Sequence, residues 1–220
     1  MTPAVHYPSR AMNANPLDRI GLVVHPRREL GRTLATVREW VGREGAALVQ
    51  VDAPGQEPQA APAGTAEGCD LVMALGGDGT TLAALRAAAP AGCPVLGMAC
   101  GSLGALTAVT AERVDEALDR VSRGDWTERR LPALAIARDG DEVMAINDLV
   151  LVRAGAGQVL VEVKVDGEPF IRLVGDGLVA GTSLGSTAYT LAAGGPMLAP
   201  GASGMVLTPL APHGGSARRW

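Results

Sequence analysis

An apolar run at Leu71–Leu75 passes without a spacer into the turn Gly76-Gly77-Asp78-Gly79-Thr80 and then into a predicted helix over 80–89. A buried strand followed at once by a turn and a helix is typical of an α/β domain with a parallel sheet. The start of such a helix presents main-chain N–H groups that bind phosphate, and glycines let a ligand come close to them. The turn therefore predicts both a fold class and an anion-binding site.

Strands and helices alternate on both sides of this turn. Four short apolar runs predict buried strands, at 19–24, 47–51, 71–75 and 94–98. Helices are expected where apolar residues recur every three or four positions, over 29–43, 80–89 and 111–123. Residues 52–68 are rich in Pro, Ala, Gly and Gln and have no periodicity, which predicts a loop.

The pattern changes after Trp126. Strand-like runs at 131–138, 142–153 and 158–165 are separated by Asp139-Gly140, Gly155-Ala156-Gly157 and Asp166-Gly167 turns, which indicates hairpins. We therefore expect a flexible tail over 1–18, an α/β domain with a Rossmann-like parallel sheet over 19–125, and a mainly β domain over 126–220.

Composition excludes several classes of function. The formal charge of −4 and the pI near 5.4 supply no basic surplus for nucleic acid. No apolar run is long enough to span a bilayer and no signal peptide is evident, so we expect no membrane partner and a cytoplasmic location. Cys69, Cys93 and Cys100 are odd in number and lack CxxC spacing, which argues against a disulfide framework and a protein-bound metal.

Asp78 is the informative residue of the turn. A carboxylate within an anion-binding turn repels phosphate unless it serves a proton or a Mg²⁺ ion. Phosphate, Mg²⁺ and a base are what phosphoryl transfer to a hydroxyl requires. The alternative is a tight turn in which Asp78 or Thr80 caps the helix. The turn matches neither the Walker A motif nor the Rossmann GxGxxG motif.

Several motifs resemble one family. LGGDGT at 75–80 is similar to a signature of the NAD kinases and, more distantly, of diacylglycerol and sphingosine kinases. GDGLVA at 175–180, TSLGSTAY at 182–189 and GGP at 194–196 closely resemble a stretch of the NAD kinases that has no counterpart known to us in lipid kinases. INDLVLVR at 146–153, GSLGAL at 101–106, Thr208-Pro209 and Pro212-His213 are similar to further family segments. The resemblance covers roughly residues 19–215.

The resemblance implies a role for each matching residue. Asp78 would be the catalytic base toward a ribose hydroxyl, and the residues around the ATP phosphates would be Gly76, Gly77, Gly79 and Thr80. The substrate would be bound by Asn147 and Asp148 at ribose hydroxyls, Asp176 near the nicotinamide or second ribose, Thr187, Ala188 and Tyr189 at the adenosine, and His213. From the residues alone, Tyr189 is equally a half-buried core residue and His213 equally an exposed loop residue.

Departures from the family pattern concentrate near the acceptor. Asp148 stands where the family has Glu, and the other changes are Ser183, Leu184, Thr190, Ala192 and Ala105. The phosphate turn is intact, so phosphoryl transfer is better supported than NAD as the acceptor. The chain also ends soon after His213. Compared with the resembled family, this implies a shortened β domain. Such a domain exposes sheet edges that a homo-oligomer would cover.

The leading hypothesis is therefore a kinase that uses ATP and Mg²⁺ to phosphorylate the adenosine 2′-hydroxyl of NAD, giving NADP. The alternatives are a divergent relative acting on another nucleoside or sugar-like alcohol, and a catalytically silent nucleotide-binding protein. A lipid kinase is disfavoured by the second signature. The sequence leaves the phosphate donor, ATP or polyphosphate, open.

Overall fold

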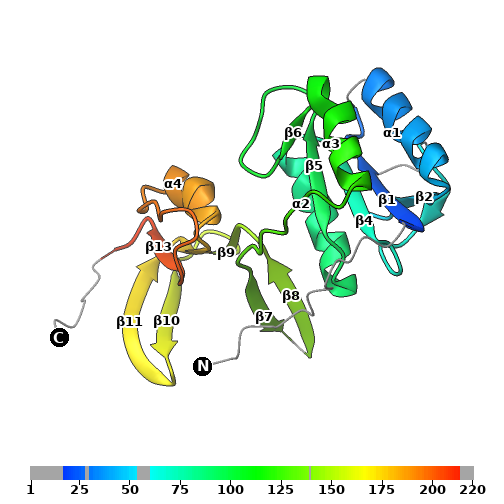
Figure 1. Ribbon diagram of the computed structural model, residues 1–220. Coiled ribbons are helices and arrows are strands. Elements are labelled where there is room, and N and C mark those ends of the chain that lie inside the picture. Colours follow the sequence, from blue (N-terminus) through cyan, green and yellow to red (C-terminus); the bar gives the residue numbers. More distant parts are fainter. Residues whose placement is uncertain (1–16, 28–29, 54–59, 139, 214–220) are drawn as a thin grey trace. The chain divides into compact units, whose positions relative to one another are not determined.

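A computed structural model describes residues 17–27, 30–53, 60–138 and 140–213 (Figure 1). The chain forms two compact units, and their described parts are residues 17–129 and 130–213. Most of the predicted tail over 1–18 lies outside the described residues. Within the part of the chain that the structure describes, no helix has the length and apolarity needed to cross a membrane.

Residues 17–129 form a parallel sheet of six strands in the order β3-β2-β1-β4-β5-β6. The strands are β1 (Arg19–Val24), β2 (Ala47–Val51), β3 (Ala63–Gly64), β4 (Leu71–Gly76), β5 (Val95–Ala99) and β6 (Val109–Thr110). The helices are α1 (Gly31–Glu44), α2 (Asp78–Ala88), α3 (Val114–Ser122) and the short turns η1 (Ala89–Ala91) and η2 (Ala111–Arg113). The predicted Rossmann-like parallel sheet is confirmed.

Alternation along the central strands explains how the helices cover both faces of this sheet. Leu22 of β1 belongs to an apolar cluster with Trp40 of α1 and Leu118 of α3. The next residue, Val23, belongs to a second cluster with Ala84 of α2. Successive side chains of a strand point to opposite faces, so α1 and α3 cover one face and α2 the other (Figure 1).

Residues 130–213 are mainly antiparallel β structure, as expected. They contain two hairpins, β7 (Leu134–Arg138) with β8 (Asp141–Ala145), and β10 (Val159–Val165) with β11 (Glu168–Gly175). A three-stranded sheet has the order β13-β12-β9. Its strands are β9 (Asp148–Val152), β12 (Gly177–Gly181) and β13 (Val206–Leu210), and the turn η3 (Gly185–Thr187) and helix α4 (Tyr189–Ala192) follow β12.

The expected single strand over 142–153 was wrong, because it divides at Ile146 and Asn147 into β8 and β9. The cause lies in Thr182: its hydroxyl donates to the Ile146 carbonyl at 2.7 Å and its N–H donates to the Asn147 carbonyl at 2.9 Å. These bonds turn the chain out of the first hairpin and into the sheet with β12.

Two further expectations needed adjustment in the first unit. The helix after the glycine-rich turn begins at Asp78 rather than Thr80. The segment 52–68, predicted as a loop, contains the short strand β3, which pairs in parallel with β2. The buried side chain of Gln50 also accepts a hydrogen bond from the Ala60 N–H at 2.9 Å. Residues 54–59 of that segment lie outside the described residues.

Candidate functional site

The glycine-rich turn connects β4 directly to α2. Gly77 is the N-cap of the helix in an extended conformation, and Asp78 is its first residue. A Cβ on Gly76 would approach the Cβ of the buried Thr80 to 2.7 Å, so Gly76 permits the close packing of the turn. A Cβ on Gly77 or Gly79 would meet no atom of the described residues within 4 Å. The space beside these two residues is therefore open to a ligand at the positive end of α2.

The Asp78 side chain is held by a second loop rather than by its own helix. Within the described part of the chain, no side-chain hydrogen bond caps α2. Oδ2 of Asp78 accepts a hydrogen bond from the Ala105 N–H at 2.9 Å, and Oδ1 accepts one from the Leu106 N–H at 2.9 Å. The structure thus brings the glycine-rich turn together with the GSLGAL segment, and Asp78 does not act as the helix cap that was the alternative interpretation.

The loop that supplies these two N–H groups is anchored at both ends. The Cys100 N–H donates to the Gly76 carbonyl and the Ala108 N–H to the Gly97 carbonyl, each at 2.8 Å. Inside the loop, the Gly104 N–H donates to Oγ1 of the buried Thr107 at 2.8 Å. In the sequence analysis, Gly104 was named only as part of the GSLGAL motif and Thr107 was not identified. Its position directly after that motif is the only sequence feature that could have indicated its role.

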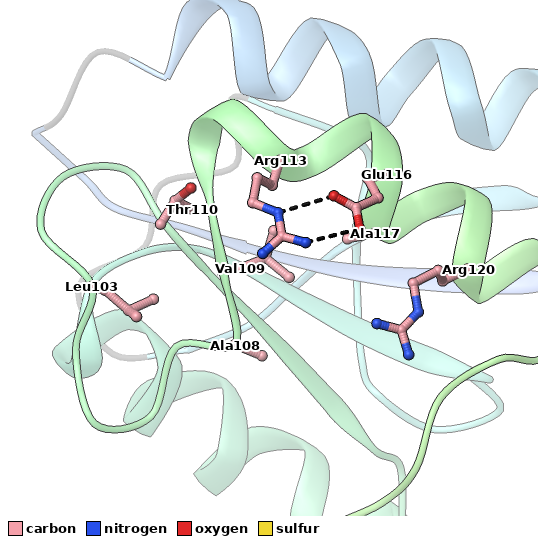
Figure 2. A pocket seen from close by; sticks show the side chains of 8 residues that line it. All are labelled: Leu103, Ala108, Val109, Thr110, Arg113, Glu116, Ala117 and Arg120. Carbon is pink, nitrogen blue, oxygen red and sulfur yellow. Dashed lines mark hydrogen bonds and ion pairs between the residues drawn. The ribbon is translucent and has the colours of Figure 1, made fainter.

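A surface pocket of about 160 Å³ lies beside the same loop (Figure 2). Leu103 and Val109 contribute to its apolar lining. Arg113 and Glu116, three residues apart in the same helical segment, form an ion pair among the lining residues, with Nε to Oε2 at 2.9 Å and Nη2 to Oε1 at 2.8 Å. This contact lowers the pKa of Glu116. Arg120 is bound to Asp125 at 3.0 Å. Both guanidinium groups are thus already paired, and the pocket contains none of the predicted site residues.

In the second unit, several predicted substrate residues gather around the start of β9. Oδ2 of Asp148 accepts a long hydrogen bond, 3.4 Å, from the Tyr189 N–H at the start of α4. The Asn147 carbonyl lies against Gly185 of η3, where a Cβ would collide with it. Tyr189 is 45% exposed, so it is not a core residue. Thr187 is the last residue of η3, and Ala188, the N-cap of α4, donates its N–H to the Gly185 carbonyl at 2.9 Å.

Asp176 and His213 lie at the other end of the same sheet. In the ladder between β12 and β9, Gly181 pairs with Asp148 and Gly177 pairs with Val152. Asp176 precedes Gly177, so it is separated from the Asp148 group by the length of β12, roughly 13 Å at the usual rise per residue. Oδ1 of Asp176 is 2.8 Å from Nε of Arg153, and the His213 N–H donates to the Val174 carbonyl at 2.7 Å.

Two family models match the chain, and together they cover most of it. Residues 49–126 match the ATP-NAD kinase N-terminal domain, and residues 146–219 match the ATP-NAD kinase C-terminal domain. The fold has the same order. A parallel sheet with helices on both faces comes first and the antiparallel strands follow, so the chain is an α/β unit followed by a mainly β unit. The chain belongs to the ATP-NAD kinase family.

Relatives with the name NAD kinase occur in several bacteria. The chain is 41% identical to the NAD kinase of Nitrosomonas europaea over 66% of its own length and 51% of the relative. It is 42% identical to that of Acidovorax sp. strain JS42 over the same shares, and 42% identical to that of Nocardia farcinica over 71% and 50%. The chain thus spans about half the length of the curated relatives that it matches.

Two solved structures have a similar fold. The NAD kinase of Archaeoglobus fulgidus in complex with ATP matches with a TM-score of 0.66 and 26% identity, over 90% of this chain and 76% of that one. Yeast NADH kinase complexed with NADH matches with a TM-score of 0.68 over 91% and 67%, at 22% identity, which shows the fold alone.

Proposed function

We propose that this protein is a kinase that transfers the γ-phosphate of ATP to the 2′-hydroxyl of the adenosine ribose of NAD, giving NADP. The observation that supports this most directly is the Asp78 carboxylate, held at the N-terminus of α2 beside the open space at Gly77 and Gly79. Membership of the ATP-NAD kinase family and the ATP bound to the Archaeoglobus fulgidus relative agree with it.

In this proposal Asp78 accepts the proton of the 2′-hydroxyl. The hydroxyl oxygen then forms a bond to the γ-phosphorus, and the bond from that phosphorus to the bridging oxygen breaks, releasing ADP. Each Asp78 oxygen accepts one main-chain N–H, which leaves lone pairs free for the proton. Gly76, Gly77, Gly79 and Thr80 form the turn at the ATP phosphates.

Mg²⁺ enters the proposal as part of the nucleotide substrate. Mg²⁺ is commonly bound through one or two carboxylates together with substrate phosphates, and Asp78 is the carboxylate of this turn. Three or more metal-ligating His, Cys, Asp or Glu side chains do not gather at any point of the described residues. The ion would neutralise charge that develops on the transferred phosphoryl group.

For the acceptor, we propose that Asn147 and Asp148 bind ribose hydroxyls and that Thr187, Ala188 and Tyr189 border the adenosine. The exposed Tyr189, whose main-chain N–H contacts the Asp148 carboxylate, suits a base stacked near a bound ribose. Asp176 and His213 lie at the opposite end of β12, and we assign them to the nicotinamide half of an extended dinucleotide.

A direct assay tests the proposal. The purified protein is incubated with Mg²⁺, either ATP or polyphosphate, and a panel of NAD, NADH, nucleosides and sugar alcohols, and products are identified by mass. We expect NADP from ATP and NAD. If a different alcohol is phosphorylated in preference to NAD, the proposed acceptor is wrong and the proposed kinase activity stands. If no acceptor is phosphorylated, the protein is a nucleotide-binding protein without kinase activity.

We also propose that the protein is a homo-oligomer. Of the eleven large apolar residues that are exposed within the described chain, ten lie in residues 130–213, among them Val152 at 62% and Met197 at 65%. Contiguous exposed apolar patches mark protein interfaces, and we propose that some of these residues form such a patch. Light scattering tests the idea, because a monomeric mass at micromolar concentration with full activity contradicts it.

The three thiols, Cys69, Cys93 and Cys100, agree with a reducing cytoplasm.

A further inference from the structure

The contact between Asp78 and the loop at 101–107 points to a function for Gly104, a residue to which the family resemblance assigned no role. We propose that Gly104 is a positioning residue, which keeps open the space that the Asp78 carboxylate occupies between the N–H groups of Ala105 and Leu106. The inference rests on the proposed role of Asp78 as the base. It adds that the orientation of this base is set by the second loop and not by the turn that carries it.

Two hydrogen bonds determine the orientation of the carboxylate. A single N–H would allow the group to rotate about its Cβ–Cγ bond, but here each oxygen has its own donor, at 2.9 Å in both cases. Hydrogen bonds to an ionised group are stronger than those between neutral groups. The donors are themselves fixed, because the loop is bonded to Gly76 and Gly97 through Cys100 and Ala108. The carboxylate therefore has one favoured plane.

The space for this arrangement exists only because residue 104 has no side chain. A Cβ at Gly104 would approach Cγ of Asp78 to 2.5 Å and Oδ2 to 2.7 Å, distances that real Cβ atoms do not tolerate. The main chain at Gly104 is not in the left-handed region, so alanine itself is not strained there. The atoms that must move are the end of a short side chain, which can rotate away.

Gly104→Ala should therefore fold while displacing the base. Gly97 differs in this respect, because a Cβ there would meet the main-chain oxygen of Leu106 at 2.8 Å, which cannot move without the loop. A substitution at Thr107 disturbs the position of Gly104 more mildly. Its hydroxyl accepts the Gly104 N–H at 2.8 Å, so Thr107→Val removes the bond that fixes Gly104 while keeping the shape of the side chain.

The experiment compares Gly104→Ala and Thr107→Val with Gly42→Ala, a control in α1 where an added Cβ has no neighbour within 4 Å among the residues that the structure describes. We expect kcat with ATP and NAD to fall about 10²-fold in Gly104→Ala, the cost of misplacing a reacting group by about 1 Å. The KM for ATP should change little, because the turn at Gly77 and Gly79 is untouched. Thr107→Val should lose about tenfold, a small part of the value of a general base.

Amide hydrogen exchange, followed by NMR, provides a readout that does not depend on activity. The N–H groups of Ala105 and Leu106 should be protected in the wild type and in Gly42→Ala. Both should exchange faster in Gly104→Ala, and one of the two should exchange faster in Asp78→Asn, which keeps a single acceptor oxygen. If the wild type phosphorylates nothing, the proposed function fails, and exchange still decides whether Gly104 positions Asp78. Unchanged protection in Gly104→Ala, or unchanged kcat with lost protection, overturns the inference. Should Gly104→Ala not fold, the same two outcomes in Thr107→Val decide.

Discussion

The main-chain N–H of Tyr189 donates to Oδ2 of Asp148 across 3.4 Å, which joins the start of β9 to the start of α4. This distance is beyond the usual range for an N–H···O bond. Asp148 is the position at which the resembled family has glutamate, one methylene longer. A carboxylate whose contact with its donor is this long has capacity left to accept a hydrogen bond from a ligand hydroxyl.

Restoring the family residue should therefore change the choice of acceptor. In Asp148→Glu the carboxylate extends further from β9, and we expect kcat/KM for NAD to rise relative to that for the best alternative alcohol. A site that bonds a hydroxyl discriminates strongly when a partner is displaced. The ratio of the two kcat/KM values in both proteins is the measurement. A ratio that stays constant or moves against NAD means that Asp148 does not face the acceptor or that NAD is not the native substrate.

Asp78→Asn should abolish turnover at a small cost in stability. Asparagine keeps one oxygen, so one of the N–H groups of Ala105 and Leu106 loses its acceptor, at a cost of about 1–3 kcal/mol. Loss of a general base lowers kcat by about 10²- to 10⁴-fold. Steady-state kinetics and thermal unfolding measure the two effects. A variant that retains most of the wild-type kcat would show that Asp78 is not the base.

Gly185→Ala should destabilise the second unit without a direct effect on the turn at Asp78. A Cβ there collides with the main-chain carbonyl of Asn147, which is held by the Thr182 N–H. Overpacking of this kind costs about 1–3 kcal/mol. Gly157→Ala is the matched control, because its added Cβ is more than 4 Å from every described neighbour. Calorimetry of both variants checks the prediction, and equal melting temperatures would contradict it.

The α/β half of the chain was predictable because its signals are local. The strands at 19–24 and 47–51 have the bounds expected from their apolar runs, since each contributes buried residues to the centre of a parallel sheet. The division at Ile146 and Asn147 was not predictable. It depends on Thr182, 36 residues away from Ile146, and no periodicity in the run 142–153 records that contact.

The candidate site was predictable as a set of residues but not as an arrangement. The glycine pattern identified Asp78, yet its partners Ala105 and Leu106 are 27 and 28 residues away and act through main-chain N–H groups, which leave no trace in residue type. The separation of Asp176 from Asp148 follows from the register of β9 and β12. Register is a property of the pairing, and the motifs that contain these residues do not encode their distance.

Two buried threonines offer a last test, through opposite effects of the same substitution. Oγ1 of Thr208, in β13, is buried and lacks a hydrogen-bond partner among the described residues, whereas Oγ1 of Thr182 donates to the Ile146 carbonyl and accepts the Gly185 N–H at 3.1 Å. A buried polar group without a partner is costly, and a valine of the same shape removes that cost. Thr208→Val should therefore raise the free energy of unfolding by up to about 1 kcal/mol, while Thr182→Val should lower it by about 1–3 kcal/mol because the Gly185 N–H loses its acceptor. Calorimetric unfolding of both variants beside the wild type measures the two shifts. If both variants lose stability equally, the Thr208 hydroxyl has a hydrogen-bond partner such as a bound water, and its burial does not destabilise the fold.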